Sequence, residues 1–159
     1  MADEAEQQAQ QPAAGQGAGW VDPYRGFNFK LEIQGLTGGH FAECSGIGVK
    51  VNVISYREGG NNQLTHRIPG AVEYSGITLR YGLTKSTDLW MWLQKVVQGS
   101  VERRNVSVVM LEADGNTEAL RWNLINAWPS EWEGAPLDAM GSELAIETLT
   151  LVFERLERG

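Results

Sequence analysis

The chain has 159 residues, of which 42% are hydrophobic, so it is long enough for one domain that buries its own core. Its net charge of −7 argues against a nucleic-acid-binding protein, because such proteins usually carry a basic face. One cysteine and two histidines exclude an intrachain disulfide framework and argue against a structural zinc site, and we expect no cofactor.

No apolar run reaches the length of a transmembrane helix. The N-terminal MADEAEQQAQQ lacks the basic and apolar regions of a secretory signal peptide. We therefore expect synthesis and folding in the cytoplasm, without insertion of this chain into a membrane.

Apart from Met1 and Pro12, residues 1–19 consist of Ala, Gln, Gly and acidic residues, without an aromatic side chain. Such a segment buries too little surface to offset the entropy lost on ordering. The composition predicts a disordered leader followed by a single domain over residues 20–159. An arm that orders against a neighbouring subunit and a frayed helix are the alternatives.

Alternating apolar residues predict strands in the first half of the chain. Phe27–Ile33 alternates strictly, and Phe41–Tyr56 is expected to form a second, long strand. Gly46 and Gly48 predict a bulge or a close backbone approach within it. A polar connector, Arg57–Pro69, is expected to lead to the next strand, Glu73–Tyr81.

A helix is predicted to open at Ser86–Asp88 and to stop at Gly99. Its apolar stripe repeats at helical spacing, through Leu89, Trp92, Leu93 and Val96. The neighbouring Trp90 and Met91 lie off this stripe and belong either to the peripheral core or to an interface.

The second half is expected to be β-structure again. Arg104–Glu112 and Glu118–Trp128 are joined by the turn sequence Ala-Asp-Gly-Asn, with Pro129 ending the second strand and 136–141 forming a loop. The last strand, Glu143–Leu156, shifts its apolar phase and therefore needs a bulge or bend. About six strands and one helix predict a mainly β fold, a β-barrel or β-sandwich with one packed α-helix.

Catalytic motifs are absent from the sequence: it holds no G-x-S-x-G, H-E-x-x-H or P-loop. His40 and His66 lack partners at metal-binding spacing, and Cys44 is interpreted as a half-buried, inert thiol. Glu131 and Glu133 flank Trp132, which leaves a carbohydrate-binding or hydrolytic β-domain as an alternative. A solvated edge in a Pro/Gly loop is the simpler interpretation, and we expect no enzyme.

Three ordered segments carry a family resemblance: DPYRGFNFKLEIQG (22–35), IPGAVEYSGITLRYGLTKSTDLWMWL (68–93) and LRWNLINAWPSEWEGAPLDAMGSELAIETLTLVFE (120–154). Together they resemble the tail tube (inner tube) protein family of contractile injection systems and contractile phage tails, over roughly residues 20–157. The resemblance implies six copies in a ring and stacked rings that form a hollow conduit. It also implies sheath, baseplate and terminator partners, and cargo or DNA that passes without specific binding. A baseplate tube-initiator protein of the same fold is an alternative.

The resemblance also implies which residues assemble the tube. The connector and the segment before the first strand are expected at ring-to-ring contacts, with plain solvated loops as the alternative. The stacking set is Asp22, Pro23, Tyr24, Arg25, Arg57, Glu58, Gly59, Gly60, Asn61, Asn62, His66 and Arg67. Candidates for lining the channel are Lys50, Asn52, Thr78 and Arg80, although a period of two leaves open which strand face lines it. The particle itself could be found outside the cell after release.

Overall fold

The computed structural model describes residues 23–36, 41–60, 63–83 and 85–159. In this part of the chain there are nine strands and one helix, where the sequence predicted about six strands. In chain order they are β1 (Phe29–Ile33), β2 (Phe41–Ser45), β3 (Gly48–Arg57), β4 (Thr65–Ser75), β5 (Ile77–Gly82), α1 (Asp88–Val97), β6 (Arg104–Leu111), β7 (Glu118–Glu133), β8 (Ile146–Val152) and β9 (Arg155–Arg158). The predicted leader and His40, Asp22, Asn61 and Asn62 lie outside the described residues.

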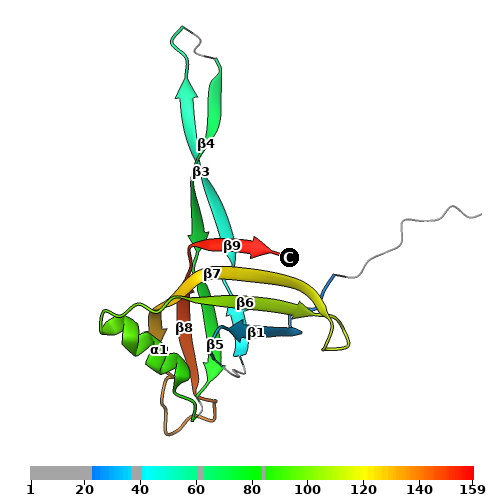
Figure 1. The fold of residues 1–159 in the computed structure, drawn as a ribbon, viewed down its shortest axis with the longest axis vertical. Coiled ribbons are helices and arrows are strands. Elements are labelled where there is room, and N and C mark those ends of the chain that lie inside the picture. Colours follow the sequence, from blue (N-terminus) through cyan, green and yellow to red (C-terminus); the bar gives the residue numbers. More distant parts are fainter. Residues whose placement is uncertain (1–22, 37–40, 61–62, 84) are drawn as a thin grey trace, which may run out of the picture.

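The body of the molecule is an antiparallel sheet that folds over on itself. Its strand order is β1-β6-β7-β8-β5-β2, with β9 on the first half of β7 (Figure 1). The 16-residue strand β7 pairs with β6 and β9 in its first half and with β8 in its second half. Asn126, with φ 56°, lies between the two halves. Because β1 and β2 remain the two ends of the order, the fold is a sandwich and not a closed barrel.

Two predicted strand boundaries in the second half are corrected. Pro129 does not end its strand: it is buried, and β7 continues to Glu133 past a register shift between Pro129 and Glu131. A bulge there accommodates a residue without a backbone N–H. The expected bend in the last strand is confirmed, because β8 and β9 are separated at Phe153–Glu154 and pair with different halves of β7. Leu144, however, lies before β8 and is 85% exposed.

Helix α1 packs against β7 and closes one side of the core. The predicted stripe is confirmed, since Trp92 and Leu93 are buried on it. The indole Nε1 of Trp92 donates a hydrogen bond to the carbonyl oxygen of Glu102 at 2.7 Å, and the Arg104 guanidinium lies 5.4 Å from the Trp92 ring centroid. Trp90 is 41% exposed and packs edge-on against Trp132, at 4.8 Å between ring centroids. The predicted stop at Gly99 is also confirmed by its φ of 88°.

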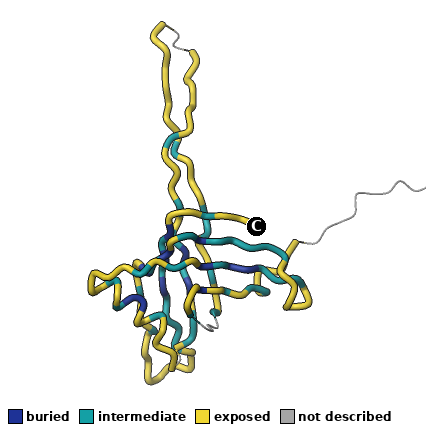
Figure 2. The backbone as a smooth tube through the Cα atoms, in the orientation of Figure 1, coloured by how far each residue is buried: buried dark blue, intermediate teal, exposed yellow. Residues whose placement is uncertain are grey.

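Strands β3 and β4 form a two-stranded arm that projects away from the body (Figures 1 and 2). The long strand predicted over 41–56 is therefore divided into β2 and β3. The polar connector was predicted too long, because Thr65–Pro69 belongs to β4 and only residues 58–64 remain between the strands. The strand predicted over 73–81 is likewise divided at Gly76. Phe27, the first residue of the strand predicted over 27–33, precedes β1 and is 72% exposed.

The base of the arm depends on two glycines. Gly46 has φ 90°, and a Cβ atom there would lie 2.7 Å from the carbonyl oxygen of Gly76. A Cβ atom on Gly76 would lie 3.0 Å from the carbonyl oxygen of Leu151. The close backbone approach predicted near Gly46 is thus confirmed. It lies where β2 leads into β3 and β4 leads into β5, which is where the chain passes between the body and the arm.

Candidate assembly interface

The half of the arm next to the body has one apolar and one polar side. Residues paired across two strands point to the same side, so Val49 lies beside Tyr74 and Val51 beside Val72. The Tyr74 ring also contacts the core residue Phe153, at 5.6 Å between centroids. This side, the core-side face, therefore extends the hydrophobic core out of the body. Val49, Val51 and Val72 are nevertheless 46–56% exposed.

On the opposite side of the sheet and of this half of the arm lies a polar surface, which we term the open face. On the arm it carries Lys50 and Glu73 as a cross-strand pair, and the Asn52 side-chain amide donates a hydrogen bond to the Glu73 carboxylate at 2.7 Å. In the body, two rows of paired residues cross β2, β5, β8 and β7 on this side. They are Ser45, Thr78, Thr150 and Glu131 in one row and Glu43, Arg80, Thr148 and Glu133 in the other.

The four candidates for lining the channel therefore share one side of the molecule. Lys50 and Asn52 lie on the open face of the arm, and Thr78 and Arg80 lie on the open face of β5. Arg80 forms an ion pair with Glu43, at 3.1 Å between Nη1 and Oε2. Charges of both signs and hydroxyl groups therefore lie side by side on this face.

The connector residues of the stacking set gather at the end of the arm. The Arg57 guanidinium donates a hydrogen bond to the Thr65 hydroxyl at 3.4 Å. The His66 Nε2 atom lies 3.9 Å from the Glu58 carboxylate. Both pairs, with Gly59, Gly60 and Arg67, are exposed. The connector residues of the stacking set are therefore accessible for contact with another molecule.

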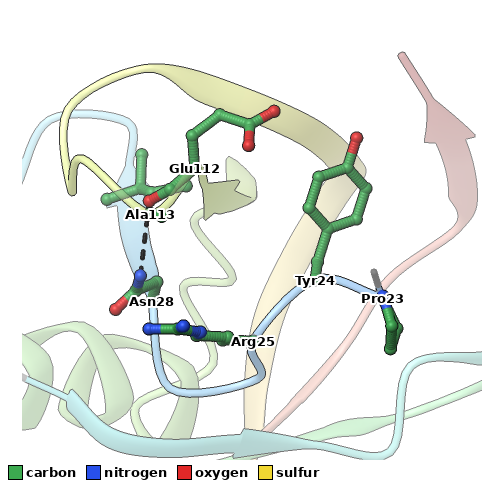
Figure 3. A pocket seen from close by; sticks show the side chains of 7 residues that line it. Pro23, Tyr24, Arg25, Asn28, Glu112 and Ala113 are labelled. Carbon is green, nitrogen blue, oxygen red and sulfur yellow. Dashed lines mark hydrogen bonds between the residues drawn. The ribbon is translucent and has the colours of Figure 1, made fainter. Parts of the chain in front are cut away.

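The segment before β1 lies elsewhere. Pro23, Tyr24 and Arg25 line an open depression next to the turn between β6 and β7, together with Asn28, Leu111, Glu112 and Ala113 (Figure 3). The Asn28 side-chain amide donates a hydrogen bond to the Glu112 carbonyl oxygen at 3.3 Å. The structure thus does not bring the two predicted stacking segments together within one chain.

Sequence reasoning missed several exposed apolar side chains. Their pattern in the sequence resembles that of an ordinary half-buried strand or a loop, and only the structure shows that none of the described residues covers them. On the arm they are Val49, Val51, Val53, Ile54, Tyr56, Ile68 and Val72, and in the loop before β8 they are Leu137, Met140 and Leu144.

Glu131 and Glu133 lie on an exposed strand and not in the Pro/Gly loop that the sequence suggested. Within residues 23–36, 41–60, 63–83 and 85–159, no group of three or more His, Cys, Asp and Glu side chains is placed to hold a metal ion. In the same residues, no helix is both long and apolar enough to cross a membrane.

The Cys44 thiol provides a test of the packing between β2 and β5. Burial, reinforced by the Glu43 charge, raises its pKa from 9.0 to about 11. Thiolate is the reactive form, so alkylation by iodoacetamide at pH 8 should be at least about tenfold slower in the folded protein than in denaturant. Equal rates in the two conditions, followed by mass spectrometry, would contradict this burial.

Comparisons with known proteins agree with this architecture. Residues 25–157 match the family model described as T4-like virus tail tube protein gp19. A search of curated proteins gives no match. Among solved structures, the chain is similar to one in the anti-feeding prophage tube-terminating cap, at 21% identity and a TM-score of 0.82, covering 94% of this chain and 99% of that chain.

Two further structures share the fold. One comes from the sheath-tube complex of an extracellular contractile injection system, PVC, at 25% identity and a TM-score of 0.78, covering 86% of this chain and 91% of that chain. The other is Hcp1 from Flavobacterium johnsoniae, at 16% identity and a TM-score of 0.53, covering 82% and 94%. With the family match spanning most of its length, the chain belongs to the T4-like virus tail tube protein gp19 family, a family of structural tube proteins.

Proposed function

We propose that this chain is the repeating subunit of an inner tube, in which six copies close into a ring and rings stack into a hollow conduit. The observation that carries the proposal is the pair of faces, one apolar and one polar, that run along the sheet and the half of the arm next to it. The core-side face carries valines that the described residues of a single copy leave exposed. The two sheet ends, β1 and β2, are also available for pairing. Association of copies would bury both features.

The open face is the proposed lining of the channel. Lys50, Asn52, Thr78 and Arg80 lie on it, among further polar residues of β8 and β7. This face carries four carboxylates (Glu43, Glu73, Glu131 and Glu133) and two cations (Lys50 and Arg80), so both signs of charge occur along its length. Such a lining would allow cargo or DNA to slide without specific binding.

The proposed partners follow from the tube. Its outside would contact a sheath protein, and its ends would contact baseplate and terminator proteins. The PVC structure, described as a sheath-tube complex, supports the first contact by analogy. We further propose assembly in the bacterial cytoplasm and a role without catalysis, in a phage tail, a secretion system or an extracellular injection particle.

A tube-initiator protein of the baseplate is the second candidate, since a structure from the anti-feeding prophage baseplate shares the fold at a TM-score of 0.76. An initiator would form one ring and stop, whereas a repeating subunit would extend the stack. The carbohydrate-hydrolase alternative is disfavoured, because Glu131 and Glu133 are exposed on strand β7 and a raised-pKa acid of a glycosidase needs a sheltered site.

Electron microscopy and native mass spectrometry of the purified protein distinguish these candidates. A repeating subunit should form hexamers and, at high concentration, tubes of many rings. Hexamers that never stack would favour the initiator. A strictly monomeric protein at millimolar concentration would contradict the proposal.

A further inference from the structure

The turn between β6 and β7 contains a chemically reactive pair of residues. Asp114–Gly115 is the one place in the sequence where Asp or Asn precedes Gly. Glycine has no side chain to shield its backbone nitrogen, so that nitrogen can attack the carboxyl group of the preceding residue. Residues 113–118 are exposed, and no atom lies within 4 Å of the Cβ position of Gly115. Neighbouring atoms therefore do not block this attack.

The reaction would rebuild the main chain of the turn. The Gly115 nitrogen forms a bond to the side-chain carbonyl carbon of Asp114, and its proton leaves together with the carboxyl hydroxyl group as water. The succinimide ring that results then takes up one water molecule and opens on one of two sides. One opening restores aspartate. The other gives isoaspartate, whose main chain runs through the side-chain carbonyl carbon and is longer by one methylene group.

The folded turn holds the carboxyl group of Asp114 in other contacts. It accepts hydrogen bonds from the backbone N–H groups of Asn116 and Thr117, at 3.0 Å each, and from the Thr117 hydroxyl. These donors stabilise the ionised carboxylate and lower the pKa of Asp114, with the Thr117 hydroxyl as the largest cause. The attack requires a protonated carboxyl group, because its hydroxyl leaves as water. The turn therefore reduces the reactive form.

The nitrogen of Gly115 is also engaged. Its N–H donates a hydrogen bond to the Glu112 carbonyl oxygen at 3.0 Å, and the Glu112 N–H donates to the Thr117 carbonyl oxygen at 2.8 Å. The first bond directs the Gly115 N–H toward Glu112, and the second closes the end of the hairpin. Both reacting groups must therefore leave their hydrogen bonds before they can meet. An exposed hairpin end reaches such a state by local opening or by unfolding of the chain.

We propose that Asp114–Gly115 is a site of isoaspartate formation that the folded turn suppresses and that the opened or unfolded chain exposes. Thr117 is the positioning residue, because its hydroxyl and its N–H both hold the carboxylate. An added methylene group would change the length of a turn that joins two core strands, which contribute Val106, Val108 and Leu124. A chain that has remained unfolded would then carry a lasting defect in this hairpin. The inference does not depend on tube assembly.

Ageing of the full chain at neutral pH, folded and in guanidinium chloride, tests the proposal. Peptide mapping by mass spectrometry with electron-transfer fragmentation measures isoaspartate at position 114. Its formation should be at least about tenfold faster in denaturant, where the turn is open. Asp138 precedes an alanine and serves as the internal control, with little isoaspartate in either condition. Equal rates at Asp114 in the folded and denatured chain would overturn the inference.

Three variants test the role of Thr117. Thr117→Val removes the hydroxyl and should speed the reaction in the folded protein about threefold or more, with no change in denaturant. Thr117→Ser keeps a hydroxyl and should retain the wild-type rate. Thr65→Val removes an exposed strand hydroxyl on the arm and should leave the rate unchanged. A wild-type rate in folded Thr117→Val, or an equal increase in Thr117→Ser, would contradict the role of the hydroxyl.

Discussion

Replacing Trp92 by alanine should lower the free energy of unfolding by about 3–5 kcal/mol. The side chain is 1% exposed in the main core, and truncation leaves a cavity between α1 and the sheet. It also removes the hydrogen bond to the Glu102 carbonyl and the contact with the Arg104 guanidinium. Urea denaturation of the monomer, followed by circular dichroism, measures the change.

Two variants serve as controls for that result. Met91→Ala changes a side chain on the same helix that is 57% exposed, so its effect should stay within about 0.5–1 kcal/mol. Trp92→Phe keeps most of the apolar volume but loses the indole N–H, and it should lie between the other two. A loss below about 1 kcal/mol for Trp92→Ala would show that α1 does not close the core.

Gly46→Ala should destabilise the monomer by about 3 kcal/mol or more. A non-glycine residue at φ 90° costs about 1–3 kcal/mol by itself. In addition the new Cβ atom would lie 2.7 Å from the Gly76 carbonyl oxygen, so the two strands at the base of the arm must separate. Thermal and urea unfolding of the monomeric variant measure the cost.

Gly115→Ala is the matched control, because Gly115 also has a positive φ, of 74°, but no atom lies within 4 Å of its Cβ position. The control should therefore show the backbone cost alone. If the two variants lose the same stability, the close approach at the base of the arm does not constrain the fold.

Elements with strong local signals could be predicted from the sequence. Helix α1 was recognisable because its apolar residues recur with the helical period of 3.6 residues and because Gly99 follows its end. The β6–β7 hairpin was recognisable from its turn, where Asp114 accepts hydrogen bonds from the backbone N–H groups of Asn116 and Thr117 at 3.0 Å. In both cases the neighbours in sequence are also the neighbours in space.

The arm could not be predicted because most of its residues are exposed, so no alternation of buried and exposed positions marks its strands. Thr65–Pro69 is polar and exposed, and it contains a proline that ordinarily signals a break. It is a strand only because it pairs with Ser55, Ile54 and their neighbours on β3. Bulges also hide strands from a period-of-two analysis, as at Pro129 in β7 and Gly70 in β4.

The channel-lining candidates show which face assignments the alternation of side chains along a strand can predict and which it cannot. Thr78 and Arg80 were expected on a common face, since they are two residues apart in one strand. Alternation could not show that Lys50 and Asn52 lie on the same side as these two residues. It is interrupted at Gly46, between β2 and β3, and at Gly76, between β4 and β5. The cross-strand pairs and the Tyr74–Phe153 contact provide this relation.

A cryo-electron microscopy reconstruction of the assembled protein is the most direct measurement of the central claim, that a two-faced sheet and arm form the wall of a tube. The expected result is a sixfold ring in stacked array, with Lys50, Asn52, Thr78 and Arg80 toward the channel and Val51 and Val72 buried against another copy. A tube whose channel is lined by the core-side valines, or an assembly in which the arm contacts no other copy, would contradict it.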